Sequence, residues 1–213
     1  MYGPIVRYLE TGVVTALMDP NPAALEYMAR SCPDARTFTD YDEFLADGDI
    51  DAVVIGSPPF LHCEQTIQAA GAGKHVLCQK PFARTVAECD AMISACRDAH
   101  VVLMTAFMKR FDKSFCLAKQ MIDAGELGQV FQVRCDWSFW GGDPRYWGWR
   151  STLPTWGGLF ADLGSHTIDL CRWWLGEVET VSGEIRIVQA GREVEDTAIA
   201  TLGHAGGAIS LHH

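Results

Sequence analysis

Residues 52–59 read AVVIGSPP, a short apolar run with the length of a buried strand that ends at a Gly-Ser-Pro-Pro turn. A helical pattern follows at 60–72, a second strand at 75–79 (HVLCQ), another helix at 85–100 and a third strand at 101–106. Strands that alternate with helices over short connections indicate parallel βαβ units. This part of the chain therefore predicts a doubly wound α/β sheet.

The alternation also extends upstream, where 13–18 reads as a strand and 22–31 as a helix. After a helix predicted at 111–124, the pattern changes to longer strand-like runs around a helix at 163–175. These runs lie at 130–139, 178–189, 195–202 and 207–212. They are typical of an α+β domain with a mostly antiparallel sheet. We place the domain boundary near Ala106, which gives one domain at 1–106 and a second at 107–213.

Composition narrows the class of protein. The chain has 213 residues, 48% of them hydrophobic, so it is long enough to bury a core. A formal net charge of −10 argues against nucleic acid and anionic membranes as partners, because both attract clustered Lys and Arg. The eight cysteines are scattered without a CxxC pair, which is typical of reduced thiols. With no membrane-spanning run and no leader sequence evident, we expect a soluble cytoplasmic protein.

Two short motifs carry candidate chemistry. Residues 75–81 read HVLCQKP, in which an apolar strand stops at Lys80 and Pro81. Because ligands of open α/β sheets bind beyond the carboxyl ends of strands, Lys80 is placed to face a cofactor or substrate; a surface lysine at a strand end is the alternative. Residues 162–166 read DLGSH and set Asp162 and His166 four residues apart, on one face if a helix starts there. That pair suits acid/base work, although a capping Asp before a core His has the same spacing.

Taken together and in order, residues 73–81 (GKHVLCQKP) and 157–169 (GGLFADLGSHTID) resemble the Gfo/Idh/MocA family of nicotinamide-dependent sugar and polyol oxidoreductases. The resemblance covers nearly the whole chain. It implies a Rossmann domain followed by an α+β domain, and a catalytic set of Lys80, Asp162 and His166. In that role His166 would remove the hydroxyl proton, Lys80 would stabilise the developing alkoxide and hold the cofactor, and Asp162 would order the two.

The resemblance also implies the cofactor and its contacts. If Gly3 is the third glycine of a G-x-G-x-x-G loop, Asp19 falls about 20 residues after the first glycine, where an acidic residue binds ribose hydroxyls. No Arg follows Asp19, which favours NAD over NADP; an N-cap for the next helix is the alternative. We further expect Ser57, Pro58 and Gln79 along the cofactor. His62 belongs to the same group, with a helix-surface imidazole as its alternative.

Gln79 departs from the commoner Glu-Lys-Pro form of the motif. It keeps a hydrogen-bond acceptor but loses a charge, which puts the electrostatic tuning of Lys80 in doubt. Arg110 and Arg150, with Asp162 and His166, are candidates for substrate contacts, and the aromatics beside the two arginines suit a sugar ring. For Trp147 and Trp149 packing is the alternative, and Asp169 is equally a pocket or a helix-surface residue. No His/Cys cluster has metal-ligand spacing, so no metal is expected.

At both ends, the sequence begins or stops within an element of the family pattern. Residues 1–9 read as the start of a helix with no strand before it, and the last residues stop in a strand-like run. We therefore expect an internal fragment that lacks the first Rossmann strand. The expected function is hydride transfer between nicotinamide and a secondary hydroxyl of a sugar, inositol or related polyol, in a homo-oligomer built through the second-domain sheet. The alternatives are a redox-cycling glycosidase-like enzyme and a catalytically silent NAD- or sugar-binding protein.

Overall fold

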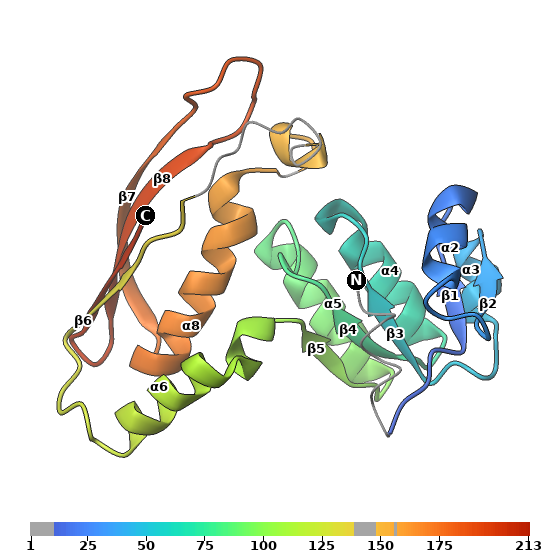
Figure 1. Cartoon of the computed structure of the whole chain (residues 1–213), viewed down its shortest axis with the longest axis horizontal. Helices are drawn as coiled ribbons and strands as arrows, with labels where there is room; N and C mark the ends of the chain where they lie inside the picture. Colours follow the sequence, from blue (N-terminus) through green and yellow to red (C-terminus); the bar gives the residue numbers. More distant parts are fainter. Residues whose placement is uncertain (1–10, 139–147, 156) are drawn as a thin grey trace. The chain divides into compact units, whose positions relative to one another are not determined.

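A computed structural model of the chain describes residues 11–138, 148–155 and 157–213 (Figure 1). The chain divides into two compact units. Unit 1 consists of Met1–Ile55, Glu64–Leu77 and Asp90–Met104, and unit 2 of Gly56–Cys63, Cys78–Cys89 and Thr105–His213. Within the described residues, no helix combines the length and the apolar character needed to cross a bilayer.

Unit 1 begins with a parallel pair of short strands, β1 (Ala16–Met18) and β2 (Arg36–Phe38), connected through α2 (Pro22–Ala29). Asn21 caps α2, because its side chain accepts a 3.0 Å hydrogen bond from the Ala23 N–H. A short helix, α3 (Tyr41–Leu45), follows. The sequence pattern did not predict β2, which has no apolar run, or α3, which is too short to show a helical period.

A second sheet has the strand order β3 (Ala52–Ile55), β4 (His75–Cys78) and β5 (Leu103–Thr105), with α4 (Pro59–Gly71) and α5 (Val86–Asp98) in the connections. The predicted alternation of strand and helix is confirmed: β3, β4 and α4 lie within one residue of the predicted bounds, and α5 and β5 are shorter by three residues each. The prediction of one doubly wound sheet is realised as two sheets in the described residues, because β1 and β3 are not paired.

Unit 2 is built on a mixed sheet of order β6-β9-β8-β7. Two of its strand pairs are antiparallel and the pair of β6 and β9 is parallel, so the expected mostly antiparallel sheet is confirmed. Along β8, Ala198, Ala200, Leu202 and His204 are buried while the residues between them are more exposed. The strands are β6 (Gln132–Cys135), β7 (Val178–Arg186), β8 (Thr197–His204) and β9 (Ile209–His212).

Helices cover one side of this sheet. Helix α8 (Ser165–Leu175) contacts β9, and α6 (Lys113–Asp123) contacts α8 (Figure 1). The single helix predicted at 111–124 is divided at Asp112, which ends the 3₁₀ turn η1 (Met108–Phe111) and caps α6 by accepting from the Ser114 N–H.

A buried polar chain fastens α8 to the sheet. His204 Nδ1 lies 2.8 Å from the Gly176 carbonyl, which can only accept, so Nδ1 carries the hydrogen and Nε2 accepts from the Ser210 hydroxyl at 2.9 Å. The Ser210 hydroxyl also lies 2.9 Å from His212 Nε2, and His212 Nδ1 lies 2.8 Å from the Thr167 hydroxyl, which lies 3.1 Å from the Gly164 carbonyl. Burial, and then the neighbouring His204, lower the pKa of His212.

Candidate active site

The glycine pair ahead of Asp162 allows a close backbone approach. A Cβ on Gly157 would lie 2.1 Å from the Arg150 carbonyl oxygen, so no side chain fits there. Gly158 has φ +123 and donates its N–H to the same carbonyl at 2.9 Å. The pair therefore holds the segment before Asp162 directly against the backbone of Arg150.

Asp162 itself lies in a π-helical turn, Phe160–Gly164, that leads directly into α8. The carboxylate of Glu195 anchors the start of this turn by accepting from the Phe160 N–H at 3.0 Å, and the Glu195 carbonyl accepts from the Leu159 N–H at 3.0 Å. Turns of this kind occur mostly as local insertions, frequently at functional sites. The predicted helix at 163–175 thus has an irregular first turn, and that turn carries the acidic residue.

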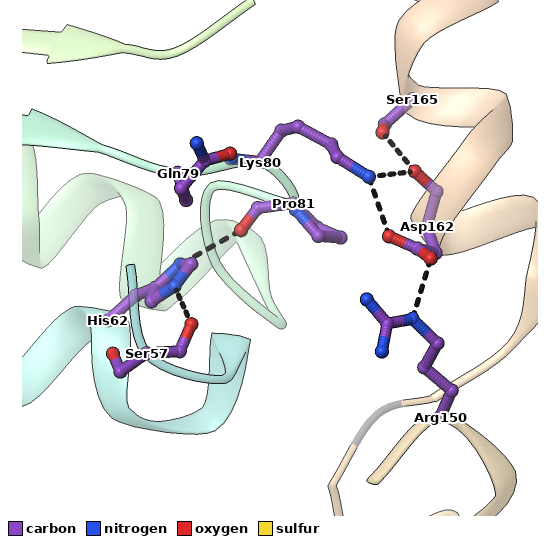
Figure 2. A network of polar contacts seen from close by, with 8 residues as sticks. All are labelled: Ser57, His62, Gln79, Lys80, Pro81, Arg150, Asp162 and Ser165. Atoms are coloured by element: carbon purple, nitrogen blue, oxygen red, sulfur yellow. Dashed lines mark hydrogen bonds and ion pairs between the residues drawn. The ribbon is translucent and has the colours of Figure 1, made fainter. Parts of the chain in front are cut away.

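Asp162 binds two cations at once. Lys80 Nζ donates to its Oδ1 at 2.6 Å and to its backbone carbonyl at 2.9 Å, while Arg150 Nε donates to its Oδ2 at 2.7 Å. Figure 2 shows the two side chains meeting the carboxylate from different sides, with Ser165 donating to the same carbonyl at 3.0 Å. The Asp162 side chain is 4% exposed and that of Lys80 14%. Burial alone would raise the pKa of Asp162, but Lys80 and then Arg150 outweigh it and hold the pKa below its ordinary value.

His166, one turn further on, is buried and electrically neutral near pH 7. Burial lowers its pKa to about 4, helped by the charges of Lys80 and Lys109, against the opposing charges of Asp162 and Asp169. Its Nδ1 is buried and has no hydrogen-bond partner within the described part of the chain. The Trp137 ring stacks on the imidazole, with centroids 5.8 Å apart and planes 16° from parallel. A neutral imidazole with unfilled hydrogen-bonding capacity can accept a proton.

One expected arrangement is wrong in its detail. Asp162 was expected to order both Lys80 and His166, yet no hydrogen bond joins Asp162 to His166, both of which the structure describes. The carboxylate oxygens face Lys80 and Arg150 instead, and Asp162 acts on His166 through its charge. The concern that Lys80 lacks an acidic neighbour is also removed. Its acidic partner comes from 82 residues away in sequence, which no local pattern reveals.

Arg110 and Arg150, expected at the substrate, are both engaged by carboxylates. Arg110 donates from Nε and Nη2 to Asp169 at 2.8 Å each, and its guanidinium lies 5.6 Å from the Trp173 ring centroid. Asp169 is buried, which corrects the alternative that it lies on the helix surface. The Arg150 guanidinium stacks 4.3 Å from the Trp149 ring centroid. Trp147 lies outside the described residues.

Three of the expected cofactor contacts lie in unit 2. Ser57 and Pro58 follow β3, and Gln79 follows β4, where its Oε1 accepts from the Lys80 N–H at 3.2 Å. Strand ends are where ligands of such sheets bind.

For His62, both the surface alternative and a direct cofactor contact are wrong, because the side chain is fully buried and both ring nitrogens face backbone carbonyls. Nε2 lies 2.8 Å from the Ser57 oxygen, and Nδ1 lies 2.9 Å from that of Pro81 (Figure 2). His62 therefore joins the loop after β3 to the loop after Lys80.

The remaining cofactor residues belong to unit 1. Asp19 follows β1 directly and its Oδ1 accepts from the Asn21 N–H at 2.8 Å. The N-cap alternative for Asp19 is wrong, because Asn21 caps the helix. The Asp19 carboxylate keeps acceptor capacity for ribose hydroxyls. Gly3 lies outside the described residues.

No group of three or more His, Cys, Asp or Glu in the described ranges has a geometry that could hold a metal ion. All eight cysteines are described, and all eight are free thiols.

The sequence did not single out Trp137 or Lys109 for a role. Trp137 belonged to a segment predicted only as a strand, and Lys109 precedes Arg110 directly in the sequence.

Comparison with known proteins gives two family matches. Residues 2–107 match the oxidoreductase family with an NAD-binding Rossmann fold, and residues 115–213 match the GFO/IDH/MocA C-terminal domain. Levoglucosan dehydrogenase of Pseudarthrobacter phenanthrenivorans is 32% identical over 195 residues, 90% of this chain and 50% of that protein. Myo-inositol 2-dehydrogenase of Thermotoga maritima is 28% identical, over 97% of this chain and 62% of that protein.

Among solved structures, WlbA dehydrogenase from Bordetella pertussis, in complex with NADH and UDP-GlcNAcA, has a TM-score of 0.85 and 32% identity. The match covers 94% of this chain and 63% of that one. The chain thus spans half to about three fifths of the length of these relatives.

Proposed function

Because the chain belongs to the Gfo/Idh/MocA oxidoreductase family, we propose that it contributes the catalytic residues of an NAD-dependent dehydrogenase. The reaction is the reversible oxidation of a secondary hydroxyl of a sugar, inositol or related polyol to a carbonyl. The relatives named as levoglucosan and myo-inositol dehydrogenases support this substrate class. The observation that carries the proposal is a buried Lys80–Asp162 ion pair beside a His166 that is neutral near pH 7.

The residues divide the chemistry as follows. His166, with its pKa near 4, is unprotonated in neutral solution and takes the proton from the substrate hydroxyl. Lys80, held by its ion pair with Asp162, stabilises the oxygen as negative charge develops on it. The bound nicotinamide supplies the acceptor for the hydride that leaves carbon. Asp162 fixes the position of Lys80 with two contacts, one from its carboxylate and one from its carbonyl.

The preference for NAD over NADP is argued from the side chain at the end of β1. Asp19 at the carboxyl end of β1 presents a carboxylate, which accepts from ribose hydroxyls and repels a 2′-phosphate. That chemistry fits NAD better than NADP, and the NADH in the WlbA complex supports the same choice. In unit 2, Ser57, Pro58, Gln79 and Lys80 are the residues proposed to hold the nicotinamide half.

Two variants test the proposal in the protein supplied with NAD and a panel of sugars and inositols. Lys80→Met and His166→Ala should each lower kcat by roughly 100-fold or more, as expected for charge-stabilising and proton-transfer groups. Circular dichroism establishes that the fold is retained. Activity within a few-fold of the parent in either folded variant would remove that residue from the catalytic set, and an absence of NADH formation across the panel would overturn the activity.

We further propose that the protein acts in the cytoplasm as a homo-oligomer. The eight free thiols support a reducing compartment. Strand alternation in β8 leaves Ile199, 53% exposed, on the face of the unit 2 sheet opposite Leu202. Light scattering of the protein and of an Ile199→Asp variant tests assembly through this face. A monomeric parent, or an unchanged mass for the variant, would refute it.

A further inference from the structure

Several cations lie around His166 and Asp162 among the described residues. The Asp162 carboxylate pairs with Lys80 and Arg150, and Arg110 pairs with Asp169, whose charge also acts on His166. The charge of Lys109 acts on His166 as well. The protein as a whole has a net charge of −10, so this group of cations is local.

Lys109 is the cation in this cluster that has no acidic partner within the described ranges. It lies in η1, directly after β5, at the strand end where ligands of such sheets bind. Its Nζ is 5.6 Å from the centroid of the Trp137 ring, which itself stacks on His166. A second ring, that of Phe115, lies 5.7 Å from the same Nζ. The two rings hold the ammonium near His166 without cancelling its charge.

We propose that the substrate is an anionic sugar or polyol, and that Lys109 is the residue that recognises its negative group. This rests on the proposed dehydrogenase function and specifies the substrate class of the same site. Lys80 contacts Asp162 and is proposed to contact the reacting oxygen, and Arg150 also contacts Asp162. Lys109 is therefore better placed than either of them to bind an anionic group of the substrate. A carboxylate or a phosphate ester on the substrate would pair with the Lys109 ammonium.

Matched ligands show whether the site prefers a carboxylate or a phosphate ester. D-glucose, D-glucuronate and D-glucose 6-phosphate, with the corresponding galactose set, are titrated by calorimetry into the protein in the presence of NADH. In the parent protein we expect at least one anionic member to bind at least tenfold more tightly than its neutral partner. Lys109→Met should abolish that preference and leave affinity for the neutral sugar within a few-fold. Lys113→Met, which removes the same charge from an exposed position at the start of α6, should retain the preference.

Three results would overturn the inference. They are equal affinities for neutral and anionic members, no binding by any member, and a preference for the anionic member that survives in Lys109→Met. Whether the carboxylate or the phosphate is preferred identifies the anionic group. A different result would overturn the proposed dehydrogenase function. In that case anions bind in a Lys109-dependent way, but no NADH forms when the protein is given NAD in place of NADH. A raised KM for the anionic substrate with little change in kcat distinguishes recognition by Lys109 from a general structural effect.

Discussion

Acidification should destabilise the fold through His166. Burial, Lys80 and Lys109 lower its pKa to about 4 from 6.5, while an unfolded chain titrates near 6.5. Between these two values the unfolded state binds more protons than the folded state, so stability is fully present above pH 6.5 and is lost as the pH falls toward 4. At about 1.4 kcal/mol per pH unit, the loss is about 2 kcal/mol at pH 5 and about 3 kcal/mol at pH 4.

Urea unfolding followed by tryptophan fluorescence at pH 7, 6 and 5 measures this loss. His166→Gln removes the ionisable ring and should flatten the pH dependence by most of the stated amount. A residual slope of the same sign remains, because the pKa of His212 is also lowered. His100→Gln, at an exposed position after α5, is the matched control and should keep the parent slope. If His166→Gln loses stability with falling pH as steeply as the parent, the ring is not held neutral by its surroundings and the proposed base loses its support.

Three further outcomes are expected. Comparison of kcat/KM for the two cofactors should favour NAD, and NADP used equally well would remove Asp19 from the ribose site. Gly157→Ala should lower stability by about 1–3 kcal/mol in urea unfolding, because its Cβ would meet the Arg150 carbonyl at 2.1 Å, whereas Gly48→Ala, with nothing within 4 Å, should not; equal effects would refute the close approach. Thr167→Val should cost about 1–3 kcal/mol by leaving His212 Nδ1 unpaired in the core, and a cost near zero would mean that the polar chain does not stabilise α8.

Much of the fold was predictable, because local patterns determine it. The strands β3 and β4 have apolar runs that stop at turn residues, and both were placed within a residue or two. The strand β2 (Arg-Thr-Phe) has no apolar run and is mostly exposed, and the five residues of α3 are too few to reveal a helical period, so both were missed. The π turn was missed for another reason. Its backbone depends on the Glu195 carboxylate, 35 residues away from Phe160.

The site was predictable as a set of residues but not as a set of contacts. Lys80, Asp162 and His166 stand in recognisable motifs, and the structure places Lys80 on Asp162. Their partners are invisible in sequence, because ion pairs and ring stacking join distant segments. The pairing of Arg110 with Asp169 and the stacking of Trp137 on His166 are both of this kind. The substrate contact of Arg110 stays a prediction, and its pairing with the buried Asp169 could not be foreseen from the sequence.

The substitution at position 79 acquires a physical meaning from these contacts. A Glu before Lys80, the commoner form of the motif, would place a second negative charge beside the ammonium, whereas Gln79 is neutral and binds the Lys80 N–H through its amide oxygen. Lys80 already has a carboxylate partner in Asp162, 82 residues further along the chain. A neutral Gln79 adds no further negative charge, and the charges of Lys80 and Lys109 favour both a neutral imidazole at His166 and a negatively charged substrate.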